Sequence, residues 1–149
     1  MSLKTLNNII GKRIDLKMTK LIPAQPEKGF VDSCCYDIYL HNTSKQIGSC
    51  SAKLGLNDVL FYIGNVGYEI NEEYRGNGFA VDAVKLLIKL FKLNGFKKII
   101  ITQVPTNVAS IRVCEKLNCT FLGVYDIPAD HIRRTKFGEE KMNVWELAI

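Results

Sequence analysis

The segment 77–104 constrains the fold of this chain most strongly, because it joins a long helix to a fully buried strand. Over residues 77–93 the polar side chains recur at helical spacing and form one narrow stripe, which consists of Asp82, Lys85, Lys89 and Lys92. Apolar side chains cover most of the remaining circumference, so this helix is expected to pack against a sheet. Asn94-Gly95 ends the helix, and the continuous apolar run 97–104 is typical of a strand covered on both faces.

Shorter elements on either side complete the predicted sheet. Strands are expected at 11–17, 34–40, 46–54, 61–70, 120–127 and 142–148, and the turn 42–45 makes a hairpin of the second and third. Gly64 and Gly67 interrupt the fourth strand, which indicates a bulge or a close backbone approach. Pro105 ends the buried strand, and Asn107 can cap a second helix over 108–117. The order β-β-β-β-α-β-α-β-β predicts one α+β domain over residues 1–149, with a mixed, mostly antiparallel sheet.

The composition of the chain argues against several classes of function. The 149 residues carry a net charge of +5, which suits an anionic ligand, but the basic residues are scattered and no aromatic side chains alternate with them. We therefore expect no nucleic-acid partner. The five cysteines include no CxxC pair, so buried, reduced thiols are expected rather than zinc ligands or disulfides. No apolar run approaches the roughly 20 residues that cross a membrane, and the N-terminus lacks a secretory layout, so the protein is expected in the cytoplasm without a membrane partner.

The stretch Arg75-Gly76-Asn77-Gly78-Phe79-Ala80 lies between the fourth strand and the long helix. The first N–H groups of a helix have no internal partner and form the positive end of its dipole, so an anion can bind there. Glycine at 76 and 78 either lets an anion approach these groups or only supplies the positive φ of a tight turn. A Walker-type loop is excluded because its Lys and hydroxyl are missing. A dinucleotide fingerprint is excluded because Val81 stands where a small residue is required.

A second polar segment, TQVPTNVASIRVCEKLNC (102–119), follows the buried strand. Pro105 splays the end of that strand, Asn107 begins the next helix, and Ser110 lies one turn along it. A strand that splays from its neighbour opens a V-shaped crevice. The free N–H and C=O groups of this crevice can hold an extended, amide-bearing ligand.

Together the two segments resemble the acetyl-CoA-binding core of the GNAT superfamily of N-acetyltransferases. The family's first signature, Q/R-x-x-G-x-G/A, is similar to residues 73–78, where Glu73 replaces the usual first residue. The second, N-x-A/S-S-x-x-x-x-E-K-x-G-F, is matched by Asn107, Ala109, Ser110, Glu115 and Lys116, while Asn118-Cys119 stands where Gly-Phe is usual. The strand GNVGYEI resembles that of the branch that acetylates ribosomal proteins and other N-terminal amines. The likeness covers residues 11–126.

The resemblance implies a GNAT-like fold, acetyl-CoA as the cosubstrate, and no metal. It implies that the N–H groups of Gly76 to Ala80 bind the pyrophosphate and that main-chain groups of Ile70 and Asn71 hold the pantetheine, with one N–H polarising the thioester carbonyl. The implied cosubstrate-binding residues are Ile70, Asn71, Arg75, Gly76, Asn77, Gly78, Phe79, Ala80, Asn107 and Ser110. The implied reaction is direct attack of a primary amine in a ternary complex. The alternative is a catalytically weak CoA-binding or regulatory module.

The catalytic candidates are Glu69, Ser110 and Cys114. Many family members carry a tyrosine where this chain has Cys114, so this thiol is either the general acid or a filler of the inner helix face. Glu69 is the candidate base unless a water chain removes the amine proton, and His131 could reach the acceptor from the C-terminal loop. The acceptor is an unidentified amine: a small amine, a peptide N-terminus or an aminoglycoside-like compound. Because only the loop 21–30 replaces the helices that the family usually has between the first two strands, the acceptor groove is either open or completed in a homodimer.

Overall fold

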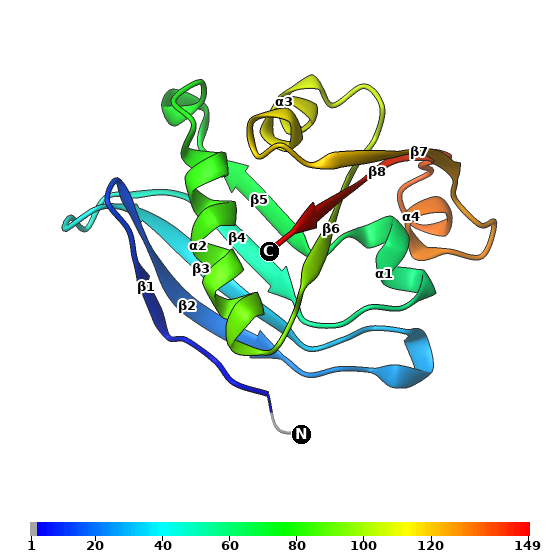
Figure 1. The fold of residues 1–149 in the computed structure, drawn as a ribbon, viewed down its shortest axis with the longest axis horizontal. Helices are drawn as coiled ribbons and strands as arrows, with labels where there is room; N and C mark the ends of the chain where they lie inside the picture. The colour runs from blue at the N-terminus through cyan, green and yellow to red at the C-terminus, as the bar shows by residue number, and fades with distance from the viewer. Residues whose placement is uncertain (1–2) are drawn as a thin grey trace.

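The computed structural model describes residues 3–149, which form two antiparallel sheets with helices packed around them (Figure 1). The first sheet has the strand order β1-β2-β3-β4-β5, and the second has the order β6-β8-β7. The strands are β1 Asn8–Ile10, β2 Ile14–Ile22, β3 Ser33–Leu40, β4 Gln46–Lys53, β5 Val66–Ile70, β6 Lys98–Gln103, β7 Thr120–Asp126 and β8 Lys141–Ala148. The helices are α1 Asp58–Ile63, α2 Phe79–Leu93, α3 Val108–Lys116 and α4 Ile132–Thr135, with short 3-10 turns at Pro26–Lys28 and Glu72–Tyr74. The predicted α+β architecture is confirmed.

The helix boundaries follow from local chemistry that the sequence already displayed. The long helix α2 begins after Gly78 and is followed by Gly95, whose φ of +82° is left-handed. Asn107 caps α3, since its side chain accepts a hydrogen bond from Ser110 N. Asn118 takes a left-handed φ of +58° after α3, in the place where the family usually has glycine. These predicted helix ends are confirmed.

The expected strand 61–70 is partly wrong, because its first residues are helical. Asn57 caps α1 by accepting a hydrogen bond from Leu60 N at 2.8 Å, and Gly64 ends the helix with a φ of +82°. The aromatic residues Phe61 and Tyr62 therefore pack as one helical turn against the second sheet. Only Val66–Ile70 forms the strand, β5.

The expected first strand, 11–17, is displaced. A turn at residues 11–13 joins β1 to β2, and β2 continues to Ile22, into the stretch that we expected to be a loop. The remaining connection to β3 holds the 3-10 turn Pro26–Lys28 and no α-helix in the described part of the chain. The shortened region between these strands is thus confirmed.

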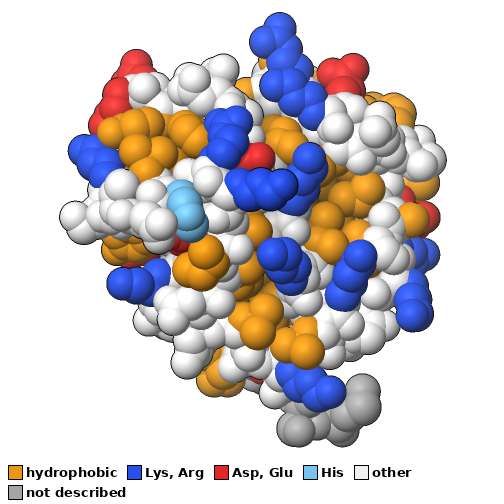
Figure 2. Space-filling model, turned by 60° about the vertical axis from the view of Figure 1, so that its left-hand side comes forward, with side chains coloured by type: hydrophobic (Ala, Val, Ile, Leu, Met, Phe, Trp, Pro, Cys, Tyr) orange, Lys and Arg blue, Asp and Glu red, His pale blue; other side chains and the backbone are white. Residues whose placement is uncertain are grey.

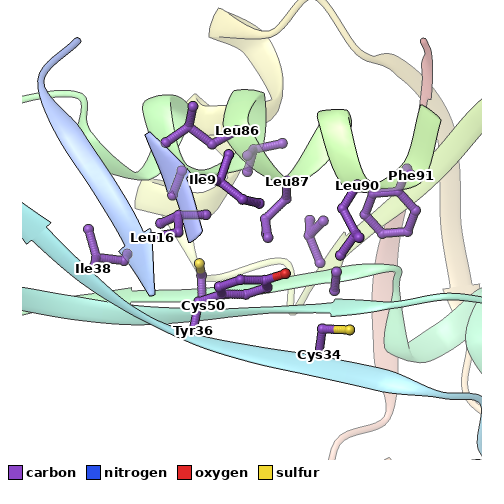
Figure 3. Packing of buried hydrophobic residues seen from close by; sticks show 14 of the residues in the cluster. Ile9, Leu16, Cys34, Tyr36, Ile38, Cys50, Leu86, Leu87, Leu90 and Phe91 are labelled. Carbon is purple, nitrogen blue, oxygen red and sulfur yellow. The ribbon is translucent and has the colours of Figure 1, made fainter. Parts of the chain in front are cut away.

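The main core lies between α2 and the first sheet. Figure 3 shows Leu86, Leu87, Leu90 and Phe91 of α2 above Tyr36 and its neighbours on the strands. The Tyr36 hydroxyl donates to Leu6 O at 2.7 Å, so this large ring buries its polar atom with a partner. Ile99 and Ile101 of β6 join this core, whereas Ile100 joins a smaller cluster beneath α1. The prediction of a strand covered on both faces is confirmed.

The two sheets meet where β5 and β6 begin. The buried Asn65 donates its N–H to Ile100 O at 2.7 Å, and its side-chain oxygen accepts from Ile100 N at 2.7 Å. Its amide group also donates to Lys53 O and Gly55 O. Beyond this junction β5 and β6 belong to different sheets, so the two strands diverge as expected from Pro105. None of the helices in residues 3–149 combines the length and apolarity that a membrane crossing needs.

Candidate functional site

A cavity of about 610 Å³ opens between the C-terminal end of β5, the start of α2 and the exposed face of α3. It is lined by Tyr68, Glu69, Ile70, Tyr74, Arg75, Gly76, Gly78, Phe79, Ala80, Val81, Asn107, Ala109, Ser110, Arg112, Val113 and Lys116. The structure thus brings residues 75–80, which we call the glycine hinge, and the segment 107–110 to opposite walls of one cavity. Arg75, Arg112 and Lys116 place positive charge on its walls, which favours an anionic ligand.

The hinge presents a run of free N–H groups. Gly76 and Gly78 have φ of +81° and +79°, and the first hydrogen bond at the start of α2 runs from Asp82 N to Gly78 O. Within residues 3–149 no acceptor pairs with the main-chain N–H groups of residues 76 to 81. Consecutive donors at the positive end of a helix form an anion site of the kind that binds phosphate.

The open edge of β5 offers further main-chain groups. Lys53 N donates to Asn65 O and Asn71 N donates to Ile47 O, which fixes the alternation of the β4–β5 ladder. In an antiparallel ladder every second residue pairs with the neighbour, so Tyr68 and Ile70 direct their main-chain groups away from β4. The carbonyl of Ile70 already accepts from Arg75 Nε at 2.7 Å. Both main-chain groups of Asn71 are engaged within the protein, because its carbonyl accepts from Tyr74 N, so the expectation that they hold a ligand is not supported.

A chain of hydrogen bonds crosses the crevice from β8 to β5. Trp145 Nε1 donates to Gln103 Oε1 at 2.6 Å, which fixes the amide so that Gln103 Nε2 donates to Ser110 Oγ at 3.1 Å. Ser110 Oγ and the Tyr68 hydroxyl share a hydrogen bond of 2.7 Å. Since Ser110 accepts from Gln103, it can donate its own hydrogen to Tyr68 and leave the Tyr68 hydrogen for a ligand. Burial raises the pKa of Tyr68 to about 12, so the phenol keeps its proton at neutral pH.

Cys114 lies behind this chain rather than in the cavity. It is fully buried in the main core, and Gln103 Nε2 lies 3.6 Å from its sulfur. Its hydrogen bond with Cys119 and its burial raise the pKa of the Cys114 thiol well above the usual range. Because Cys114 is fully buried and does not line the cavity, whereas Tyr68 does, the placement favours the filler interpretation. All five cysteines are free; three of them are buried as predicted, whereas Cys35 and Cys119 are only partly buried.

The two remaining candidates, Glu69 and His131, differ in whether their side chains are accessible. Glu69 is exposed and lines the cavity, and strand alternation places it on the face of β5 opposite Tyr68. His131 is buried, with Nε2 at 3.1 Å from Val59 O and Nδ1 accepting from Arg133 N at the start of α4. Both ring nitrogens are therefore used for structure, which argues against His131 as a base. In the described chain no group of three His, Cys, Asp or Glu residues could hold a metal ion.

A family model for the acetyltransferase (GNAT) domain matches residues 14–120, most of this chain. The chain belongs to the GNAT acetyltransferase family. No curated protein matches this GNAT domain.

Solved structures share the fold at low identity. A protein from Chromobacterium violaceum described as a probable GNAT acetyltransferase aligns with a TM-score of 0.69 and 12% identity, over 99% of this chain and 88% of its own. RimL, a ribosomal α-N-protein acetyltransferase solved with coenzyme A, aligns with a TM-score of 0.65 and 14% identity, over 95% and 98%. The ribosomal-protein-S5-alanine acetyltransferase of Vibrio fischeri aligns with a TM-score of 0.58 and 21% identity, over 78% of this chain. This GNAT domain spans only 61% of that relative's length.

Sequence reasoning missed Tyr68, Gln103 and Trp145. Tyr68 lies within the strand GNVGYEI, and strand alternation puts it on the same face as Val66 and Ile70, which is the signal that could have found it. Its partner Ser110 follows 42 positions later in the chain, and Trp145 lies on the final strand. No local pattern connects these residues, because their contact depends on how far β5 and β6 diverge.

Proposed function

We propose that this protein transfers an acetyl group from acetyl-CoA to a primary amine by direct attack in a ternary complex. The observation that carries this proposal is the run of free N–H groups at residues 76 to 81, facing α3 across a cavity of about 610 Å³. Membership of the GNAT family supports the choice of acetyl-CoA over other anionic ligands. RimL, which shares the fold, was solved with coenzyme A.

The cosubstrate contacts follow from the free donors. The N–H groups of Gly76 to Ala80 bind the diphosphate, and Arg75 adds positive charge beside them. The pantetheine lies along the open edge of β5, where the main-chain groups of Tyr68 and the N–H of Ile70, rather than the groups of Asn71, are available. Asn107 and Ser110 line the opposite wall of the cavity, at α3. A free N–H at the edge of β5 polarises the thioester carbonyl.

The chemistry needs one proton acceptor and one proton donor. The amine nitrogen attacks the thioester carbon, a C–N bond forms, and the C–S bond breaks. Glu69 takes the amine proton directly or through water, since it lies on the opposite face of β5 from Tyr68. Tyr68, hydrogen-bonded to Ser110, gives a proton to the departing thiolate. Cys114 fills the core and takes no part.

The acceptor is a protein or peptide α-amine. Lys17, Asp37, Ser49 and Glu69 form a cross-strand row on one face of the first sheet, and none of them is buried. An open polar face suits an extended peptide better than a small amine, which needs an enclosing pocket. The V. fischeri relative and RimL are described as ribosomal-protein acetyltransferases, which favours an N-terminal amine of this class.

Thiol release tests the proposal. The protein is incubated with acetyl-CoA and peptides that carry a free N-terminal alanine or serine, and the release of CoA is followed with a thiol reagent. The same peptides with a blocked N-terminus are the matched control, and small amines and an aminoglycoside complete the panel.

We expect release that requires both acetyl-CoA and a free α-amine, with the acetyl group found on that amine by mass spectrometry. Tight binding of acetyl-CoA without release from any amine would make the protein a CoA-binding module. Absence of binding would contradict both functions.

A further inference from the structure

Arg13, in the turn between β1 and β2, lies outside the family's signatures but makes two contacts with the glycine hinge and one with the first turn of α2. Its guanidinium donates to Asn77 O, its Nε lies 3.2 Å from Asp82 Oδ2, and its Cζ lies 4.5 Å from the centre of the Phe79 ring. A methyl group at Gly78 would lie 3.9 Å from Arg13 Nη1. Arg13 therefore covers the hinge from the side of the first sheet.

The hydrogen bond from Arg13 to Asn77 O determines the direction of the Gly78 N–H. In a trans peptide the C=O and the following N–H point in opposite directions, so a carbonyl held by Arg13 turns the N–H of Gly78 away from it. Gly78 lines the cavity. The Asn77 side chain donates to Tyr74 O at 3.0 Å, so the Asn77 residue is held by its side chain as well as by the contact of its carbonyl with Arg13.

The contact between Arg13 and Asp82 neutralises a negative charge at the N-terminus of α2. Asp82 lies in the first turn of α2, where a free carboxylate would repel a diphosphate bound at the helix N-terminus. The Arg13 guanidinium balances this charge. The backbone of Arg13 is itself held, because Arg13 O accepts from His41 N at 3.0 Å and Gly11 N donates to Ile14 O at 3.0 Å.

The side of the molecule that carries this turn is rich in basic side chains. Figure 2 brings the β1–β2 side forward and shows Lys and Arg spread across it with few Asp and Glu in view. The exposed lysines of α2, Lys85, Lys89 and Lys92, belong to the same helix as the hinge. Within residues 3–149, none of these lysines forms a hydrogen bond or salt bridge with the hinge, whereas Arg13 donates to Asn77 O.

We propose that Arg13 is a positioning residue for the diphosphate of acetyl-CoA, which orients the Asn77–Gly78 peptide and balances the charge of Asp82. This inference rests on the proposed function, since it assumes that acetyl-CoA binds at the hinge. It assigns a binding role to a residue that is 64 positions from Asn77 in the chain.

The test compares R13A and R13K with K12A, which removes the same charge from the neighbouring exposed position of the same turn. Two quantities are measured for each protein: the Kd of CoA by calorimetry, and kcat/KM with acetyl-CoA and with S-acetylpantetheine, which lacks the diphosphate. Circular dichroism and thermal unfolding establish that each variant is folded.

We expect R13A to raise the Kd of CoA and the KM for acetyl-CoA about ten-fold, the scale of one lost charge-assisted contact, with kcat changed less than about two-fold. R13K should recover part of the affinity, K12A should match the wild type, and kcat/KM with S-acetylpantetheine should not change. An R13A protein that binds CoA as K12A does would overturn the inference, and so would an equal loss with both acetyl donors. If the wild type itself fails to bind CoA, the proposed function fails instead.

Discussion

Replacing Gly76 with alanine separates ligand binding from backbone conformation at the hinge. Gly76 lines the cavity, has a φ of +81°, and an added Cβ would meet no atom within 4 Å. In the free protein the change therefore costs only the strain of a left-handed alanine, about 1 kcal/mol of the free energy of unfolding, or about 3 °C in Tm. If the diphosphate of CoA occupies this open space, the methyl group of the alanine displaces it from several N–H donors of the hinge.

Losing one or two such contacts is worth about 3 kcal/mol, so the affinity for CoA should fall about 100-fold. Gly95→Ala is the matched control, because Gly95 has a φ of +82°, also has nothing within 4 Å of its Cβ, and lies beyond the far end of α2. Chemical unfolding and calorimetric titration with CoA are measured for both variants. If Gly76→Ala and Gly95→Ala lost the same stability and bound CoA with the same affinity, the reasoning would be refuted. The hinge would then serve only as a turn.

Three further substitutions test the remaining site and its scaffold. Tyr68→Phe should lower kcat at least about ten-fold while the Kd of CoA stays within about two-fold, and an unchanged kcat would exclude Tyr68 as the proton donor. Cys114→Ala should cost about 1 kcal/mol of unfolding free energy and leave kcat/KM within about two-fold, whereas a large loss of kcat would restore the thiol as the acid. For Asp15, burial raises the pKa, but hydrogen bonds from His41, Asn42 and Gly11 outweigh it and hold the pKa below its ordinary 3.8. This stabilisation is present above pH 3.8 and is lost as the pH falls through the lowered value. Asp15→Asn should therefore lower the free energy of unfolding in urea by about 1 kcal/mol at pH 7 and leave it unchanged in strong acid. An equal loss at both pH values would contradict this link between the pKa of Asp15 and stability.

Most of the fold could be predicted because long periodic segments determine it. The broad apolar face of residues 79–93 and the continuous apolar run of β6 are compatible only with a helix packed against a buried strand. The α1 helix was missed because the aromatic run FYI has strand propensity, although Asn57 and Gly64 carried the cap signals. At six residues, α1 is held by its caps and by packing on the second sheet rather than by propensity.

The site was predictable only where a local motif defines it. The hinge acts through its own backbone conformation and Asn107 through a side-chain cap only three residues away, so the local sequence is enough to place both. The contact between Tyr68 and Ser110, and that between Arg13 and Asn77, join segments 42 and 64 positions apart. Such contacts depend on the divergence of β5 from β6 and on the turn that joins β1 to β2, and neither has a periodic signature in the sequence.

The proposed function depends above all on the N–H groups of residues 76 to 81 binding the diphosphate of acetyl-CoA. The most direct measurement is a titration of ¹⁵N-labelled protein with CoA, followed by the amide resonances. We predict that the largest saturable shifts occur at residues 76 to 81, with smaller ones at Tyr68 and Ile70, because new hydrogen bonds form at these amides. Saturable shifts confined to other parts of the chain, with the hinge amides unmoved, would contradict the claim.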